Sequence, residues 1–403
     1  MVPDCRRRSG RRVGSSSACG PGQRYDAQRP RWGNHDWSAH RRTAVMRVVT
    51  PCRLRQLSPS KCEKTLMLAK LFTAPSRLLL VLLCAAPLLA QEPSALSGPV
   101  LGYLVDADAR LIRPIAGIPG NAWVGAPVET PFPLAFAAAL PGSAHAIASS
   151  ESGSQLLVVG LENTAARAIE GAGANPSSVA LSSRGSSAAL YYAETGSVAL
   201  IHGLPEGPAV RARIDVSQIE GRLSRMAISD DGTLAAFVFS HEDHDALYVW
   251  ASSSPPHAPL RLVTESARIA AIALLGDEVI VADRGVNEVF AVRDVRGEAA
   301  RVFLAGAREG VASPAGLSVS TRNEIYVGNA ESSTVMILEA GGRLLRTLQC
   351  ECAVTTVAPL RDSVFRLTDN LDRPIFLLDA AGDEDQIVFV PAAAPQSEAR
   401  QDP

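Results

Sequence analysis

A four-residue turn that opens with serine recurs along the chain at the spacing of a structural repeat. It is SSRG at residues 182–185 and SDDG at residues 229–232, 47 residues later, and each copy separates two short apolar runs. A related turn, STRN at residues 320–323, follows 91 residues further on, which is about two more units. A period of 40–47 residues with about four short strands in each unit is typical of a β-propeller.

Short strands dominate the pattern between residues 98 and 391. Apolar runs of four to seven residues alternate with Gly, Asp, Asn, Ser and Pro, and no segment keeps the 3.6-residue stripe of a helix over three turns. We therefore expect an all-β propeller of four-stranded antiparallel blades, followed by a disordered tail at residues 392–403. Six full units are predicted, at about 131–171, 175–216, 222–264, 268–306, 311–350 and 353–391.

An incomplete unit at residues 98–120 decides the number of blades. It contains two apolar runs, at residues 100–105 and 111–115. If it belongs to a blade, the ring has seven blades, which we expect; if it is an appendage, the ring has six. Closing the ring removes the free sheet edges that an open row of strands would expose. The predicted core between blades includes Ile228, Val281, Leu317, Val327 and Val357.

Two of the units resemble NHL-type propeller repeats. One unit contains PAGLSV at 314–319, EIYVGN at 324–329 and TVMI at 334–337, and the other contains VIVADRGVNEVFAV at 279–292. The resemblance covers about 80 residues and extends to the related bacterial YncE-like propellers. It implies the fold more than the function, because such propellers include scaffolds, ligand binders and a few lyases or lactonases.

Charge divides the chain into two unlike parts. Residues 1–66 carry 13 Arg and 2 Lys against 4 acidic residues, whereas residues 91–403 carry 22 Arg and no Lys against 37 acidic residues. The acidic balance of the repeat region argues against nucleic-acid binding, which needs clustered Lys and Arg. The absence of Lys also excludes Schiff-base and P-loop lysine chemistry from that region.

Residues 67–90 have the order of a secretory signal peptide. Lys70 and Arg77 supply a positive region, 13 apolar or Pro residues follow at 78–90, and Ala90 fits a cleavage position. The apolar run is too short for a membrane anchor, which needs about 20 residues. We therefore expect a secreted or periplasmic protein without a membrane span after cleavage.

The basic residues 1–66 do not resemble the start of an exported protein. They are rich in Arg, Ser, Gly and Pro with little periodicity, a composition that predicts disorder. We interpret Met67 as the true start, with residues 91–97 as a linker to the repeats. A basic RNA-binding arm is the alternative interpretation of the leader.

The densest polar cluster is HEDHD at residues 241–245, in a predicted hairpin turn. His241, Asp243, His244 and Asp245 could serve as ligands of a divalent metal such as Zn²⁺ or Ca²⁺. However, the spacing is not the helical His-Glu-x-x-His zinc motif. A solvated acidic turn is the alternative, and no other cofactor is expected.

Cys350 and Cys352 are the two cysteines that follow residue 90. In an extended strand their side chains would point to one face. A local disulfide or redox-variable pair, two buried thiols and a two-thiolate metal site are the options. A further distinctive segment is the Pro- and Gly-punctuated loop at 113–123, whose Trp123 either packs where the chain ends meet or contacts a partner.

No catalytic constellation is visible in the repeats. There is no Gly-x-Ser-x-Gly motif, and the five His after residue 90 do not recur at blade spacing. We expect a monomeric scaffold that binds a protein or a small ligand, rather than an enzyme. The alternative is a metal-dependent hydrolase, lactonase or lyase, with Asp230, Asp283, Asn329 and the 241–245 turn as candidate residues.

Asp283 and Asn329 occupy equivalent places after the second strand of their units. Short polar side chains at such positions hydrogen-bond nearby backbone and tolerate turn geometry. We expect this structural role for both residues.

Overall fold

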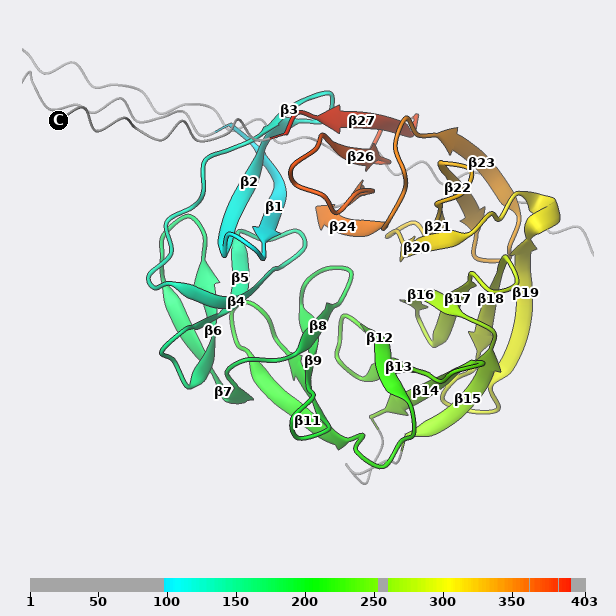
Figure 1. Cartoon of the computed structure of the whole chain (residues 1–403), viewed down its shortest axis with the longest axis horizontal. Coiled ribbons are helices and arrows are strands. Elements are labelled where there is room, and N and C mark those ends of the chain that lie inside the picture. Colours follow the sequence, from blue (N-terminus) through cyan, green and yellow to red (C-terminus); the bar gives the residue numbers. More distant parts are fainter. Residues whose placement is uncertain (1–97, 253–259, 362, 383, 393–403) are drawn as a thin grey trace, which may run out of the picture. The chain divides into compact units, whose positions relative to one another are not determined.

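A computed structural model describes residues 98–252, 260–361, 363–382 and 384–392. These residues form seven antiparallel β-sheets around one axis, which is a seven-bladed β-propeller (Figure 1). The predicted all-β fold is confirmed, and the first unit belongs to a blade rather than to an appendage. The predicted leader, signal peptide and linker, and the tail beyond residue 392, lie outside the described residues.

The blades are numbered 1 to 7 in chain order. Blade 1 consists of β1 (Val100–Asp106), β2 (Leu111–Ile118) and β3 (Asn121–Val124). Blade 2 consists of β4 (Leu134–Ala139), β5 (His145–Ser150), β6 (Gln155–Gly160) and β7 (Ala166–Gly173). Blade 3 consists of β8 (Ser178–Leu181), β9 (Ser187–Tyr192), β10 (Ser197–His202) and β11 (Ala209–Asp215). Blade 4 consists of β12 (Arg222–Ile228), β13 (Leu234–Ser240), β14 (Asp245–Ala251) and β15 (Arg261–Ser266).

The last three blades follow the same plan. Blade 5 consists of β16 (Ile269–Leu275), β17 (Glu278–Asp283), β18 (Glu288–Arg293) and β19 (Ala300–Gly306). Blade 6 consists of β20 (Pro314–Val319), β21 (Glu324–Asn329), β22 (Thr334–Glu339) and β23 (Leu344–Gln349). Blade 7 consists of β24 (Ala358–Arg361), β25 (Val364–Arg366), β26 (Ile375–Asp379) and β27 (Gln386–Val390).

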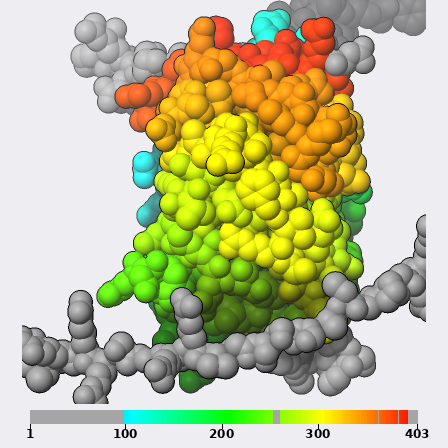
Figure 2. Space-filling view, turned by 90° about the vertical axis from the view of Figure 1, so that its right-hand side faces the viewer, coloured from blue at the N-terminus to red at the C-terminus, as the bar shows by residue number. Residues whose placement is uncertain are grey.

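Within each blade the strands follow one another from the axis to the rim (Figure 1). Seen from the side, the yellow and orange residues of blades 5 and 6 form a continuous surface (Figure 2). Helical structure in the described part of the chain is limited to η1 (Ala307–Glu309). No helix there has the length and apolar character needed to cross a membrane.

Blade 1 has three strands where the prediction gave two, because residues 113–123 are not a loop. β2 continues to Ile118, and β3 pairs with it antiparallel from Ile118↔Asn121 to Ile115↔Val124. Gly120, with φ at +80°, supplies the left-handed residue of the hairpin turn between them. After β3 the chain passes directly to β4, so among the described strands blade 1 has no fourth, outermost member.

The core lies between neighbouring blades, as predicted. Blades 5 and 6 share one apolar cluster, and comparable clusters fill the other junctions. A strand that is covered on both faces must be apolar on both, and this explains why the inner strands have nearly continuous apolar runs rather than a strict alternation. The five predicted core residues are all less than a tenth exposed: Ile228, Val281, Leu317, Val327 and Val357.

The ring closes by packing between blade 1 and blade 7. The strands of each sheet are contiguous in sequence, so no described strand is exchanged between the two ends of the ring. Leu104 and Ile115 of blade 1 lie in one buried cluster with Leu360, Ile375 and Leu377 of blade 7. The closure therefore depends on apolar contact between residues from the two ends of the repeat region.

A buried charge cluster joins blades 6 and 7. The Asp385 side chain, 1% exposed, lies 3.0 Å from Arg346 Nε and 3.7 Å from Arg322 Nη2. Arg322 also pairs with Glu324 at 3.0 Å, and Tyr326 donates a hydrogen bond to Glu324 Oε2. Burial and the Glu324 hydrogen bond raise the pKa of Tyr326 to about 12. Burial raises the pKa of Asp385 above its usual value, although Arg346 opposes the shift.

We expect the difference in unfolding free energy between the native chain and Asp385→Asn to fall as the pH rises. Because the folded-state pKa of Asp385 is raised, its favourable contribution is complete only below the unfolded-state pKa and is lost as the pH rises through the raised pKa. Urea unfolding between about pH 3 and pH 7 measures this difference.

Glu339→Gln is the control of opposite sign, because the hydrogen bond from Arg343 lowers the pKa of Glu339. The native chain should gain stability over this variant as the pH rises. A stability difference for Asp385→Asn that also grew with pH would contradict a raised pKa of Asp385 in the folded protein.

Candidate functional site

A cavity of about 530 Å³ lies at one end of the ring axis. Blades 2 to 7 all contribute to its wall, mainly through the turns that follow their innermost strands. The lining residues are Gly142, Ser183, Arg184, Asp230, Leu274, Leu275, Gly276, Val319, Ser320, Thr321, Asn323, Pro359 and Phe365. A concave site with an apolar wall and a few polar groups is the usual form of a small-ligand pocket.

The serine that opens each repeated turn holds that turn in shape. Ser182 Oγ accepts a hydrogen bond from the Ser187 N–H at 3.1 Å. Ser229 Oγ accepts from the N–H groups of Thr233 and Leu234 at 3.1 and 3.0 Å. The serine side chains thus satisfy backbone donors that the strands leave unpaired at the turn.

The last residue of each repeated turn is left-handed. The φ angles are +69° at Gly185, +66° at Gly232 and +60° at Asn323, in the region that Gly and Asn tolerate best. A Cβ on Gly185 would also lie 2.7 Å from the carbonyl oxygen of Pro141 in the neighbouring turn. The repeat therefore specifies the backbone of the turns, and the residues between Ser and Gly are left to shape the cavity.

Two charged side chains line the cavity from neighbouring blades. Arg184 Nε lies 3.8 Å from Asp230 Oδ2, and the two side chains are 69% and 38% exposed. The Arg184 N–H also donates to Asp230 Oδ1 at 2.9 Å, which fixes the carboxylate against the next turn. The guanidinium remains open to an anionic group, and the carboxylate to a cationic one.

The turn behind Asp230 is braced by further polar contacts. Burial would raise the pKa of Asp231, but hydrogen bonds from Ser229 and Thr233 outweigh it and the pKa lies below its usual value. Arg296 of blade 5 donates to Thr233 Oγ1 and to Asp277 Oδ1, both at 2.7 Å. These contacts tie the turns of blades 4 and 5 together at this end of the axis.

Asp283 and Asn329 have the predicted structural role. Asp283 is fully buried, and its carboxylate accepts hydrogen bonds from the N–H groups of Ala267, Arg268 and Gly285 and from Ser266 Oγ.

Asn329 is also fully buried. Its Oδ1 accepts from the Ala312 N–H at 3.1 Å, and its Nδ2 donates to the Gly310 carbonyl oxygen at 3.3 Å. Asp283 and Asn329 end the second strands of blades 5 and 6, at the end of those strands opposite the cavity turns. Of the residues considered for catalysis, Asp230 lines the cavity and Asp283 and Asn329 do not.

The 241–245 turn does not bring its four predicted metal ligands to one point. The rings of His241 and His244 stack with centroids 4.5 Å apart, and His244 Nδ1 lies 2.7 Å from Asp243 Oδ1. Asp243 is 87% exposed, whereas the Asp245 side chain is 1% exposed and accepts a hydrogen bond from the Ile269 N–H at 2.6 Å. Asp243 precedes β14 in the exposed turn, whereas Asp245 is the first residue of β14 and its carboxylate is held in the interior by the Ile269 N–H.

The charges in this turn are matched locally. The hydrogen bond with Asp243 raises the pKa of His244, and the same bond lowers the pKa of Asp243. Arg268 Nη1 lies 3.8 Å from Asp245 Oδ1. Within the described ranges, no group of three or more His, Cys, Asp or Glu side chains is arranged to hold a metal ion. Metal binding by the turn stays a prediction.

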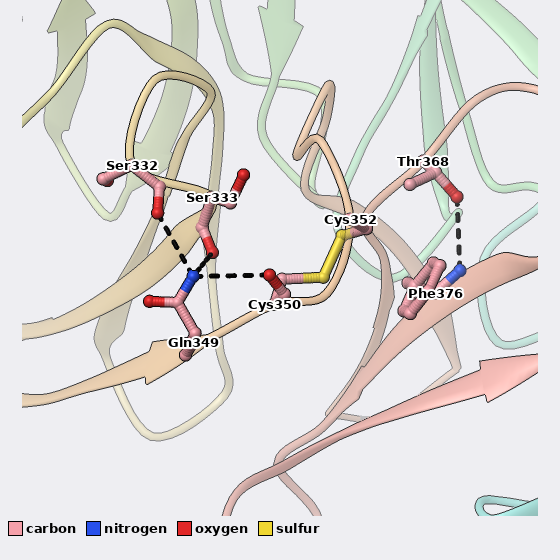
Figure 3. The surroundings of a disulfide bond; sticks show 7 residues. All are labelled: Ser332, Ser333, Gln349, Cys350, Cys352, Thr368 and Phe376. Atoms are coloured by element: carbon pink, nitrogen blue, oxygen red, sulfur yellow. Dashed lines mark hydrogen bonds between the residues drawn. A yellow bond between two sulfur atoms is a disulfide. The ribbon is translucent and has the colours of Figure 1, made fainter.

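Cys350 and Cys352 form a disulfide in the structure, with their Cα atoms 5.1 Å apart (Figure 3). Cys350 is 3% exposed, and its N–H donates to the Ser333 carbonyl oxygen at 2.8 Å. The neighbouring Gln349 Nε2 donates to the carbonyl oxygens of Ser332 and Ser333 at 3.3 and 3.1 Å (Figure 3). The disulfide thus begins the connection from blade 6 to blade 7.

Trp123 is 52% exposed on β3, so it does not fill the junction between the chain ends. Its neighbour Ala122, 8% exposed, packs in the cluster between blades 1 and 7 instead. The pleat of the strand turns the two side chains to opposite faces. The exposed half of the Trp123 side chain favours the second alternative, and contact with a partner stays a prediction.

Sequence reasoning did not identify the pairing of Arg184 with Asp230 across the cavity wall. The two residues are 46 residues apart, which is within the repeat period, so the period could have predicted that they lie in neighbouring turns. Phe365 was also missed, because it belongs to a three-residue strand whose burial is visible only in the ring.

We expect Asp283→Ala to destabilise the fold by about 3 kcal/mol, because it leaves buried N–H donors without an acceptor. Urea unfolding of the purified chain measures the loss. Asp215→Ala is the matched control, since exposed Asp215 accepts a hydrogen bond from the Ser217 N–H at a turn and should matter little. Equal effects of the two substitutions would contradict the role assigned to Asp283.

Comparison with known proteins identifies no family. No protein-family model and no curated protein matches the chain significantly. Among solved structures, a functionally unknown protein from Desulfotomaculum acetoxidans is 14% identical with a TM-score of 0.48, over 73% of this chain and 95% of that one.

Hydrazine synthase of Kuenenia stuttgartiensis is 12% identical with a TM-score of 0.45, over 75% of this chain and 99% of that one. Virginiamycin B lyase from Staphylococcus aureus is 8% identical with a TM-score of 0.43, over 64% of this chain and 83% of that one. The NHL-type and YncE-like character of the two blades remains a resemblance of their residues.

Proposed function

We propose that this chain is an exported β-propeller that works as a binding scaffold. Its ligand, a small molecule or the polar end of a protein partner, occupies the cavity at the end of the ring axis. The observation that supports this proposal is the convergence of six blades on one cavity whose described lining carries a single Arg and a single Asp. Loops held on a rigid ring are a common place for binding sites.

The chemistry of the wall favours a zwitterionic ligand. Arg184 and Asp230 present opposite charges side by side, and their exposed pair at 3.8 Å is weak enough to open for a ligand. A carboxylate can pair with the guanidinium while an ammonium pairs with Asp230. Leu274 and Leu275 provide an apolar wall for the remainder of such a molecule.

The export of the protein is part of the same proposal. Residues 67–90 have the order of a secretory signal, and a disulfide suits an oxidising compartment such as the periplasm or the exterior of the cell. We propose that the mature protein acts there as a monomer. The acidic, Lys-free composition of residues 91–403 supports a partner other than nucleic acid.

The alternative proposal is a metal-dependent hydrolase, lactonase or lyase. It would need several carboxylate, amide or imidazole ligands around the axis. Asp230 lines the cavity, but Asp283, Asn329 and the 241–245 turn do not. The binding scaffold therefore has the stronger support.

We expect zwitterionic probes, namely free amino acids and dipeptides, to bind the purified chain at this cavity. Arg184→Ala and Asp230→Ala should each raise the Kd measured by calorimetry about tenfold or more, which corresponds to ~1.4 kcal/mol. Arg343→Ala is the matched control, because Arg343 is also 69% exposed and paired with a carboxylate but does not line the cavity.

Two results would count against the scaffold. One is an Arg343→Ala variant that weakens binding as much as Arg184→Ala. The other is hydrolysis of an ester or lactone that requires added Ca²⁺ or Zn²⁺ together with Asp230, which would favour the enzyme.

A further inference from the structure

A second cavity of about 530 Å³ lies at the rim, where blades 6, 7 and 1 meet. Ile387, Val388 and Phe389 of β27 form one part of its wall. Ala122 of β3 lines the cavity from blade 1, and Gln349 and Glu351 line it from blade 6. β3 and β27 lie side by side at this junction (Figure 1).

The cavity follows the free edge of β27. Side chains of consecutive strand residues point to opposite faces, so three consecutive residues can line one groove only if the groove lies along the strand edge. β27 pairs with β26 on one side, and no strand among the described residues pairs with its other side. On that open side, every second residue of β27 directs its backbone N–H and C=O groups outward, where they can pair with an added strand.

Phe389 marks the groove as a contact surface. Its side chain is 61% exposed, the largest exposed fraction among the large apolar side chains of the described residues. An extended peptide on an open edge gains affinity from main-chain hydrogen bonds and specificity from pockets for alternate side chains. Ile387 and Phe389 lie two residues apart on β27, so they share one face of the strand, and both line the cavity.

The Cys350–Cys352 disulfide lies beside this groove. Gln349 and Glu351, which flank Cys350 in the sequence, line it directly. Cys352 packs against the same buried cluster between blades 6 and 7 as Phe376 and Ile387, and both of these residues also line the groove. Cys350 is 3% exposed and Cys352 is partly exposed, so Cys352 is the more exposed residue of the pair.

We propose that the groove binds an extended, cysteine-containing peptide as an additional strand on β27, and that the disulfide oxidises the thiols of that peptide. Glu351 is the one charged residue among the described lining residues, so the segment should carry Lys or Arg near its cysteine. A basic neighbour also increases the thiolate fraction of that cysteine, and the thiolate is the nucleophile.

The exchange balances without a further reactant. A peptide thiolate attacks Cys352 Sγ, the Cys350–Cys352 bond breaks, and the electron pair leaves on Cys350 Sγ, which takes a proton from water. A second peptide thiolate attacks the peptide sulfur of the mixed disulfide and releases the Cys352 thiolate. Two thiols become one disulfide, and their two electrons reduce the cysteine pair. A small disulfide, such as oxidised glutathione, restores the pair by the reverse exchange.

The test compares two reductants of the full-length protein at equal thiolate concentration. One is a synthetic peptide of alternating Val and Thr with two cysteines flanked by Lys, and the other is reduced glutathione. Rapid alkylation and mass spectrometry follow the free thiols of Cys350 and Cys352 and any mixed disulfide on Cys352. We expect the peptide to react about tenfold faster, because binding raises its effective concentration at the disulfide.

Phe389→Ser should remove this preference, and Phe303→Ser should keep it. Phe303 lies on β19, the outermost strand of blade 5, and is 56% exposed. Thermal unfolding of each variant checks that it is folded before the comparison. A peptide in which Glu replaces Lys should lose part of the advantage beside Glu351, and Glu351→Gln should restore it.

Three outcomes would overturn the proposal. The peptide could react no faster than glutathione. The two Phe variants could behave alike. Sedimentation could detect a dimer that the peptide dissociates, which would assign the groove to a second copy of this chain.

Discussion

Everything in this molecule depends on the apolar contact that closes the ring between blade 1 and blade 7. The two blades come from opposite ends of the repeat region, and among the described strands none is exchanged between them. Leu360 and Leu377 of blade 7 meet Leu104 and Ile115 of blade 1 in a buried cluster. Burial of such side chains contributes about 1.5–3 kcal/mol each, so a small set of contacts holds the two ends together.

The closed ring creates both surfaces to which we assign functions. It brings the serine turns of separate blades together around the axis, and there Arg184 and Asp230 pair across a blade boundary. It also leaves blade 1 with three strands beside the short β27, which opens the rim groove next to the disulfide. The axial cavity is built from the turns of six blades, whereas the rim groove is built on a strand edge.

The sequence predicted the fold well because the backbone requirements of a blade are local. Serine at the start of a turn and Gly or Asn at its end satisfy N–H donors and positive φ angles, so the same residue types recur in the turns of blades 3, 4 and 6. The structural role of Asp283 was predictable because its partners belong to its own repeat: Gly285 lies two residues later, and residues 266–268 form the connection into β16. The buried strands were visible as apolar runs.

The sites were less predictable because they depend on which side chains the ring brings together. β3 was missed because it has four residues and follows a Pro- and Gly-containing segment that looks like a loop. The four ligands proposed at 241–245 are adjacent in sequence, yet Asp243 lies in solvent and Asp245 lies in the blade interior. Asp385 meets Arg346 only through the packing of blade 7 on blade 6.

Hydrogen exchange of Leu360→Ala tests most directly whether the closure supports the whole ring. Leu360 is 7% exposed in the cluster between blades 1 and 7, and its truncation should cost about 2–4 kcal/mol. If the ring is one cooperative unit, amides of β13 in blade 4 should lose the same protection free energy as those of β1 and β24. Loss confined to β1 and β24, with β13 unchanged, would contradict the dependence of the ring on this contact.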